Sequence, residues 1–214
     1  MLSGKWSGVD LGRVVLLASA YLVFAFAFSF VGFVAQQPAI HLHEYSLPEA
    51  IVEVGGHLLF GAVVAAPLLR IDASLVSAGF AVGIDADHVL GALNLNVSSR
   101  PDHSVAFCLF AMGAMWFVAN RIGKGMPQIE RLSIVALVPA SILSHISYDI
   151  FAGYSVFNGV GFSFPLWVPF SFQLTSFPYW DWVYFEAAGA GVIVIFALMT
   201  RRRQGIAVEP KSVF

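Results

Sequence analysis

Long apolar stretches set the strongest constraint on how this chain can fold. A helix needs about 20 apolar residues to cross the roughly 30 Å hydrocarbon core of a bilayer, and about six segments approach that length. These predicted spans are Val14 to Ala35, Ala50 to Leu69, Ala73 to Leu93, Ser104 to Asn120, Leu132 to Ala152 and Asp181 to Thr200. The pattern predicts an all-α fold, a polytopic bundle of transmembrane helices.

Composition agrees with a lipid environment. Of the 214 residues, 58% are hydrophobic and 11% are charged, whereas about a quarter of the residues of soluble domains are charged. No repeat or long linker divides the chain, so residues 1–214 are predicted to form a single integral membrane domain. The net charge of -2 and the lack of a basic stripe argue against nucleic acid as a partner. The first apolar run is longer than the core of a signal peptide and is predicted to be retained as a span.

The basic residues predict the orientation of the bundle. Short cytoplasmic loops are enriched in Lys and Arg, and ten of the eleven basic residues fall on one side of the predicted spans, with only Arg100 on the other. Both termini and the loop 121–131 are therefore predicted to be cytoplasmic. The segments 36–49, 94–103 and 153–180 are predicted to be extracytoplasmic.

Ionisable side chains gather toward the extracytoplasmic ends of these spans. Such groups are costly inside a membrane unless they are paired or functional. At a rise of about 1.5 Å per residue, they fall within a slab roughly 10 to 15 Å thick. The set comprises Glu53, His57, Asp85, Asp87, His88, Asp102, His103, His145, Asp149 and Glu186.

The spacing of these residues favours metal coordination. His145 and Asp149 are four residues apart, as are Glu53 and His57, so each pair lies on one helical face. A hydrogen bond that joins two helices is the simpler alternative for either pair. In the segment 83–88, three ligand-type side chains within four positions cannot share one helical face. For all three to serve one metal, either the helix ends there or one aspartate supports a ligand without binding the metal itself. The alternative is a polar helix end that is solvated at the membrane interface and binds no metal.

The available ligand types restrict the metal. Cys108 is the single cysteine and lies in an apolar run, so any metal must be held by imidazole and carboxylate groups. These ligands favour Zn or Mn and allow Fe or Mg. Two ions bridged by an aspartate would form a site that generates hydroxide and binds the oxygens of a phosphoester. His41 and His43 are either further ligands or, more simply, a solvated pair.

The segment 153–180 is rich in aromatic residues and proline. Pro165, Pro169 and Pro178 argue against a regular helix, and Trp and Tyr favour the headgroup zone of a bilayer. The segment is predicted to lie on the membrane as a lid over the cluster. A plain aromatic anchor at the interface is the alternative.

Six segments carry a family resemblance: Gly56-His57 to Gly61, Ile84-Asp85-Ala86-Asp87, Arg100 to Ser104, Leu143-Ser144-His145 to Asp149, Gly159 to Gly161 and Pro165 to Pro169. They resemble the membrane-bound metal-dependent hydrolases of the YdjM/YbcI type. The similarity covers about residues 53–170, so the span 14–35 looks like an addition and 181–200 is a further C-terminal span. Ile84 stands where the family has proline, and Ser98 and Ser99 stand where the family usually has a histidine before the arginine. Because a ligand is missing there, the site is expected to hold either one metal ion or two.

The resemblance implies a metal-dependent hydrolase that acts on a phosphoester or other ester of a membrane lipid. His88 is expected to be a metal ligand or a proton shuttle. Arg100 is expected to pair with a phosphate or to anchor a headgroup. Asp87 is expected to be both a catalytic residue and a metal ligand. The substrate itself cannot be read from the sequence. The expected metal ligands are His57, Asp85, Asp87, His103, His145 and Asp149.

Three other functions are compatible with the same residues. A proton-coupled transporter would use them as a relay and would need ionisable groups through the whole depth of the bundle, but the cytoplasmic half of each span is apolar. A non-catalytic metal-binding subunit of a larger membrane complex is the second. A b-type haem held by His57 and His145 is the third.

Overall fold

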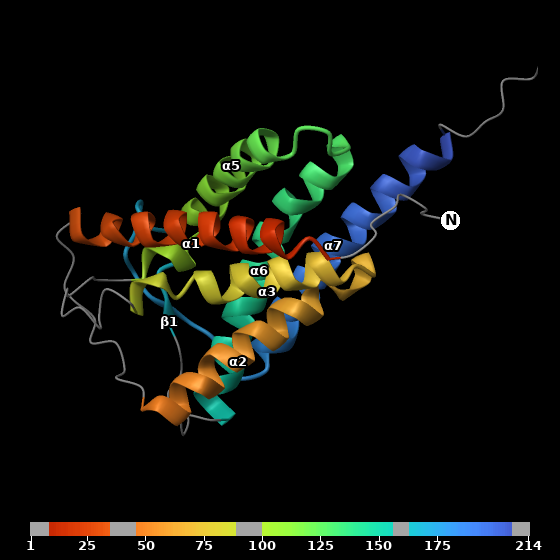
Figure 1. Cartoon of the computed structure of the whole chain (residues 1–214). Coiled ribbons are helices and arrows are strands. Elements are labelled where there is room, and N and C mark those ends of the chain that lie inside the picture. Colours follow the sequence, from red (N-terminus) through yellow and green to blue (C-terminus); the bar gives the residue numbers. More distant parts are fainter. Residues whose placement is uncertain (1–8, 35–45, 89–99, 156–162, 207–214) are drawn as a thin grey trace, which may run out of the picture.

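The computed structural model describes residues 9–34, 46–88, 100–155 and 163–206 (Figure 1). This part of the chain is mostly helical, with two strands of two residues each and a non-helical segment around them at 163–180, so the prediction of an all-α fold is confirmed. The α-helices are α1 (Leu11–Val34), α2 (Leu47–Val64), α3 (Ile71–Gly83), α5 (Val105–Ile122), α6 (Gln128–Ser155) and α7 (Asp181–Ile206). The 3-10 helices are η1 (Ala66–Leu68) and η2 (Pro101–His103), and the antiparallel strands are β1 (Ser163–Phe164) and β2 (Thr175–Ser176).

Five of these helices are long and apolar enough to cross a membrane. Their large apolar side chains are extensively exposed on the outside of the bundle, which is the distribution expected where lipid is the solvent. The spans are Leu11–Val31, Leu47–Leu68, Val105–Ile122, Gln128–Ser155 and Asp181–Thr200, close to five of the six predicted segments.

The predicted third span, Ala73 to Leu93, needs correction. Helix α3 has 13 residues and ends at Gly83, and the chain turns at Ile84 and Asp85 before Ala86–His88 resume a helical conformation. At about 1.5 Å per residue α3 extends about 20 Å, which is too short to cross a bilayer. The carboxylates that follow explain the early end, because the turn directs them into the protein instead of along an apolar helix.

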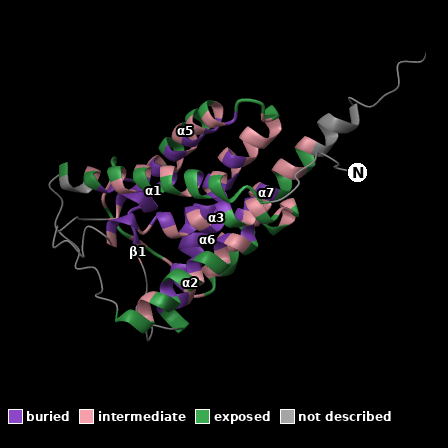
Figure 2. Cartoon of the chain, viewed as in Figure 1, coloured by how far each residue is buried: buried purple, intermediate pink, exposed green. Residues whose placement is uncertain are grey.

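Helix α6 is the centre of the bundle. It packs against α2, α3, α5 and α7, while α1 packs against α3 and α5. Figure 2 shows the buried residues concentrated on α6 and α3 in the middle of the molecule. The second half of α6, from Val138 to Gly153, is buried almost throughout. Ligand-type side chains on this part of α6 are therefore held by surrounding helices on every side.

A close contact between α2 and α3 brings His57 and Asp85 together. A Cβ atom at Gly61 would lie 2.7 Å from the Cβ atom of Ala81 and 2.8 Å from the carbonyl oxygen of Ser77, so only glycine allows this approach. The two helices form an antiparallel pair joined through η1. As a result, His57 in the middle of α2 lies beside the C-terminal end of α3, where Asp85 turns inward.

Candidate metal centre

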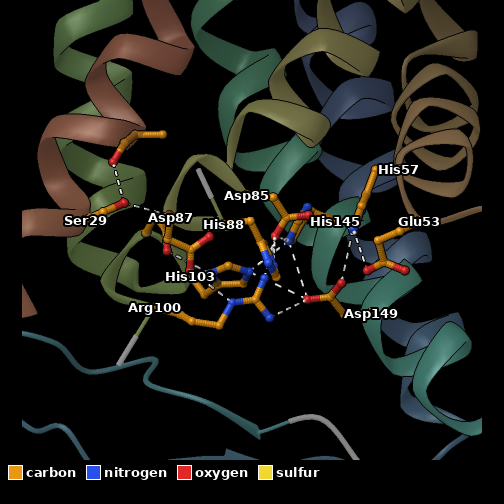
Figure 3. Close-up of polar contacts among 12 residues, drawn as sticks. Ser29, Glu53, His57, Asp85, Asp87, His88, Arg100, His103, His145 and Asp149 are labelled. Atoms are coloured by element: carbon orange, nitrogen blue, oxygen red, sulfur yellow. Dashed lines mark hydrogen bonds and ion pairs between the residues drawn. The ribbon is translucent and has the colours of Figure 1, made fainter. Parts of the chain in front are cut away.

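The expected metal ligands, which are far apart in the sequence, lie together in one largely buried cluster (Figure 3). Within it, five overlapping groups of three ligand-type side chains each have one donor atom apiece within 4.8 Å of the others. Buried clusters of this kind could hold a metal ion. The contributing elements are α2 with Glu53 and His57, the turn after α3 with Asp85, Asp87 and His88, η2 with Asp102 and His103, and α6 with His145 and Asp149.

Three carboxylates surround the Nε2 atom of His57. That atom lies 3.4 Å from Glu53 Oε1, 3.1 Å from Asp85 Oδ2 and 3.2 Å from Asp149 Oδ1. Despite these short distances, Nε2 makes no hydrogen bond of acceptable geometry with any described residue, and Asp149 Oδ1 also lacks one. The three oxygens thus surround one imidazole nitrogen without a regular hydrogen bond to it, an arrangement that a cation could complete.

His103 and His145 face each other on the other side of the cluster. Their Nε2 atoms are 2.8 Å apart. The Nδ1 atom of His145 is 2.8 Å from the carbonyl oxygen of Ala81, and because a carbonyl only accepts, Nδ1 carries the proton and donates it. The Nδ1 atom of His103 is held in the same way by Asp102 Oδ1 at 2.9 Å. Imidazoles oriented by a partner on the distal nitrogen are typical of metal ligands.

Asp85 and Asp149 each present their two oxygens to different histidines. Asp149 Oδ1 faces His57, while Asp149 Oδ2 lies 3.5 Å from His145 Nε2 and 3.6 Å from His103 Nε2. Asp85 Oδ2 faces His57, while Asp85 Oδ1 lies 3.5 Å from His145 Nε2. Two aspartates therefore span the same two positions, as carboxylates do when they bridge adjacent cations.

Arg100 is bound to the same carboxylates. Its guanidinium contacts Asp85 Oδ1 at 2.5 Å, Asp87 Oδ2 at 3.3 Å and Asp149 Oδ2 at 3.4 Å. Burial by itself lowers the pKa of Arg100, but the charges of the three aspartates outweigh burial and raise it, so the group stays charged. Arg100 has a left-handed backbone conformation, with φ of 41°, which is uncommon outside glycine. Such strain persists where surrounding contacts hold it.

The charge balance of the cluster is strongly negative. It holds five carboxylates and one guanidinium, a formal charge of −4 when the imidazoles are neutral. Burial and the charge of Arg100 favour a neutral His103, but Asp102 outweighs them and raises the pKa of His103 to about 9. Even with that proton, the cluster keeps excess negative charge. Buried charge without compensation is costly, and two divalent cations would offset it.

One side of the cluster is less buried than the rest. The side chain of His88 is 23% exposed and that of Asp85 is 16% exposed, and the Nε2 atom of His88 lies 3.5 Å from Asp85 Oδ1. Arg100 is 11% exposed. These three side chains mark the more open side of the cluster. Of the residues expected to be catalytic, His88 and Arg100 thus lie at this edge, whereas Asp87 is buried.

An aromatic ring from the segment 153–180 covers part of the cluster. Phe164 in β1 is fully buried and stacks on His103, with ring centroids 5.5 Å apart and an angle of 18° between the planes. The backbone N–H of Val105 donates to the carbonyl of Leu166, which ties this segment to the start of α5. Trp167, Phe170 and Trp180 are exposed nearby in the sequence. Residues 156–162 of the expected lid lie outside the described residues.

Four residues that contact the site were not among the expected metal ligands. Glu53 shares the i,i+4 spacing with His57, and Asp102 directly precedes His103, so both had a signal in the sequence. Ser29 in α1 donates toward Asp102 Oδ2, and the Ala81 carbonyl orients His145. Neither of these could be found from spacing, because each is a tertiary contact.

Three expectations fall outside the cluster. Glu186 in α7 belongs to none of its ligand groups, and within the described residues its carboxylate oxygens have no hydrogen-bond partner. His41 and His43 lie outside the described residues. The imidazoles of His57 and His145 stack face to face with centroids 3.9 Å apart, so no porphyrin fits between them and a haem held by this pair is excluded.

No protein-family model, curated protein or solved structure matches this chain. The geometry of the cluster therefore has to carry any statement about function.

Proposed function

We propose that this chain is a membrane-embedded metal-dependent hydrolase that acts on a phosphoester or other ester of a membrane lipid at the extracytoplasmic face. The observation that carries the proposal is the placement of Asp85 and Asp149, each with one oxygen toward His57 and the other toward His145. The similarity of residues 53–170 to hydrolases of the YdjM/YbcI type is consistent with it.

Two cation positions follow from these contacts. The first, called the His57 position, has Glu53 and His57 as its own ligands, and the second, called the His145 position, has His103 and His145. Asp85 and Asp149 are shared. Imidazole with carboxylate and no thiolate favours zinc and leaves manganese, iron and magnesium as alternatives. A bound divalent pair supplies Lewis acidity and activates water at neutral pH.

The residues at the exposed edge handle the substrate. Arg100 carries a permanent charge beside both shared aspartates, so an anionic ester group that approaches from this edge meets a guanidinium suited to bidentate binding of phosphate. Asp87 accepts from Arg100 Nε and fixes the direction of the guanidinium. His88 lies at the edge beside Asp85 and is placed to move a proton to or from the leaving group.

A lipid substrate is supported by the position of the cluster. Ten of the eleven basic residues predict the opposite face to be cytoplasmic. Both termini lie on that face when the chain from α3 to α5 completes one crossing. The cluster takes Glu53 and His57 from the first and middle parts of α2, and His145 and Asp149 from the second half of α6, the half that this orientation places outside. Exposed aromatic side chains at Trp167, Phe170 and Trp180 suit the headgroup zone on that side.

The distribution of buried ionisable groups disfavours a proton-coupled transporter. Among the described residues, every charged or histidine side chain in the buried class belongs to the cluster. The buried polar pair deeper in the bundle is Ser77 with Ser141, whose hydroxyls are 2.9 Å apart and do not titrate. A relay across the membrane would need ionisable groups on both sides of the cluster.

Metal content and hydrolysis measured on one preparation test the proposal. The purified chain is expected to contain up to two equivalents of zinc, and to hydrolyse phosphoester or carboxylester lipids in mixed micelles. Chelation should abolish the activity and zinc should restore it. Ser77→Ala, which removes a buried hydroxyl outside the cluster, is the control. Bound metal without hydrolysis of any lipid in the panel would favour the non-catalytic subunit of a membrane complex, and absence of metal would contradict the proposal.

A further inference from the structure

Helix α1 contributes a polar side chain to the support of the cluster. Ser29 is fully buried, and its hydroxyl lies 3.2 Å from Asp102 Oδ2 and 3.0 Å from the carbonyl oxygen of Ala25 (Figure 3). The other oxygen of Asp102 accepts from His103 Nδ1. A chain of contacts thus runs from α1 through Asp102 to the imidazole that faces His145.

This contact matters because Asp102 is fully buried. A buried carboxylate is costly unless hydrogen bonds satisfy its oxygens. A serine within a helix can always return its hydroxyl proton to the carbonyl four residues earlier, so Ser29 does not need Asp102 as a partner. Asp102, in contrast, has its Oδ1 committed to His103, and Ser29 is the hydroxyl within reach of its Oδ2.

Packing of α1 holds this hydroxyl in place. Tyr21, Ala25 and Ser29 follow each other at intervals of four residues and are all fully buried, so they form one face of α1. The ring of Tyr21 stacks on Phe80 of α3 with centroids 4.4 Å apart and meets Phe107 of α5 edge-on. The face that carries Ser29 is therefore packed between α3 and α5, and α5 directly follows Asp102 and His103.

We propose that Ser29 is a positioning residue: it fixes the carboxylate of Asp102, which orients His103 and so sets the affinity of the His145 position for its metal. The inference rests on the proposed metal-dependent function. It makes α1 part of the working site, although α1 precedes the region that resembles the hydrolase family. The two residues assigned to the His57 position alone, Glu53 and His57, are not among these contacts, and only the shared Asp149 links that position to His103, so its metal affinity should change less.

A double-mutant cycle on cobalt binding tests the inference. Co²⁺ replaces zinc and reports its ligands through visible absorption bands, so the two equivalents can be titrated separately in the purified full chain. Substitution of a residue that hydrogen-bonds to a metal ligand typically lowers the metal affinity 10- to 100-fold. Ser29→Ala is expected to weaken the second Co²⁺ equivalent about tenfold and to shift its absorption bands. Asp102→Asn is expected to weaken it more strongly.

The double variant separates positioning from packing. If Ser29 acts through Asp102, Ser29→Ala adds nothing once Asp102→Asn is present, because the two residues form one unit. Ser77→Ala is the matched control for loss of a buried serine, with no effect expected on either equivalent. Unchanged Co²⁺ affinity in Ser29→Ala, or effects that multiply in the double variant, would overturn the inference while the proposed function stands. A wild-type chain that takes up no Co²⁺ would overturn both.

Discussion

His103 and His145 direct their Nε2 atoms at each other across 2.8 Å, and each has its Nδ1 atom occupied by another partner. Two imidazoles held in this way present lone pairs to the same point when both are neutral. A proton on one of the two Nε2 atoms is then needed between them. With a pKa of about 9, His103 supplies the proton in the metal-free protein. In the proposed metal-bound protein, a divalent cation at the His145 position would replace that proton and bind both nitrogen lone pairs.

Removal of one histidine should distinguish the two cation positions. His145→Ala deletes a ligand of the His145 position only, so about one equivalent of metal should be lost and one retained. Asp149→Asn alters an oxygen donor of both positions and should reduce the content to less than one equivalent. Elemental analysis of the purified variants measures this. Equal losses in the two variants would show that the ligands do not divide between two positions as proposed.

Replacement of Arg100 should affect hydrolysis more than metal content. Lysine keeps the charge, but a single ammonium cannot contact three carboxylates and a substrate oxygen in the geometry of a guanidinium. Arg100→Lys is expected to lower kcat/KM at least about tenfold, and Arg100→Met about 100-fold or more, with full metal occupancy. Steady-state kinetics on lipid micelles test this. Unchanged kinetics in both variants would leave Arg100 as a headgroup anchor.

Two adjacent glycines in α2 should respond differently to the same change. A Cβ atom at Gly56 would overlap the ring of Tyr148, whereas a Cβ atom at Gly55 meets nothing within 4 Å. Tyr148 packs edge-on against His57 and donates to the carbonyl of Val52. Overpacking typically costs about 1–3 kcal/mol, so Gly56→Ala should lower the melting temperature in detergent and weaken metal binding.

Gly55→Ala is the matched control for this effect. An exposed helical glycine replaced by alanine gains up to about 1 kcal/mol in stability, so this variant should be as stable as the wild type or more stable. Thermal unfolding followed by circular dichroism compares the two. Equal melting temperatures would mean that Tyr148 does not pack against α2 as described.

Accessibility of introduced cysteines tests the orientation. In a Cys108→Ala background, cysteine at Ser46, just before α2, should react with a membrane-impermeant maleimide added to intact cells. Cysteine at Lys124, in the loop between α5 and α6, should react only after the membrane is opened. The reverse pattern would place the cluster on the cytoplasmic face and contradict an extracytoplasmic substrate.

Much of the fold and of the site could be predicted from local pattern. Apolar length predicts five of the helices closely, and the i,i+4 spacing of His145 and Asp149 places both on one face of α6. The extent of the third span could not be predicted in the same way. Hydropathy averages over a window and misses a turn at Asp85 that depends on partners elsewhere in the chain.

The contacts that complete the site depend on tertiary structure. Ser29 and Asp102 are 73 residues apart, and a serine in an apolar helix has no distinguishing sequence context. Arg100 was expected to pair with a phosphate, but in the structure it lies against three carboxylates. This position depends on the turn before α5, which the spacing of apolar residues does not predict. The positions and spacing of the His and Asp residues predict the main ligands, and only the geometry shows which oxygens they share.

X-ray absorption at the zinc edge, on the purified zinc-loaded chain, tests the central claim most directly. Two zinc ions bridged by Asp85 and Asp149 should each have a first shell of nitrogen and oxygen ligands at about 2.0–2.2 Å. A second zinc ion should scatter at roughly 3.5–4 Å. That metal–metal distance should disappear in Asp149→Asn. A zinc-loaded wild type without a zinc–zinc distance, or a chain that retains no zinc, would contradict the account.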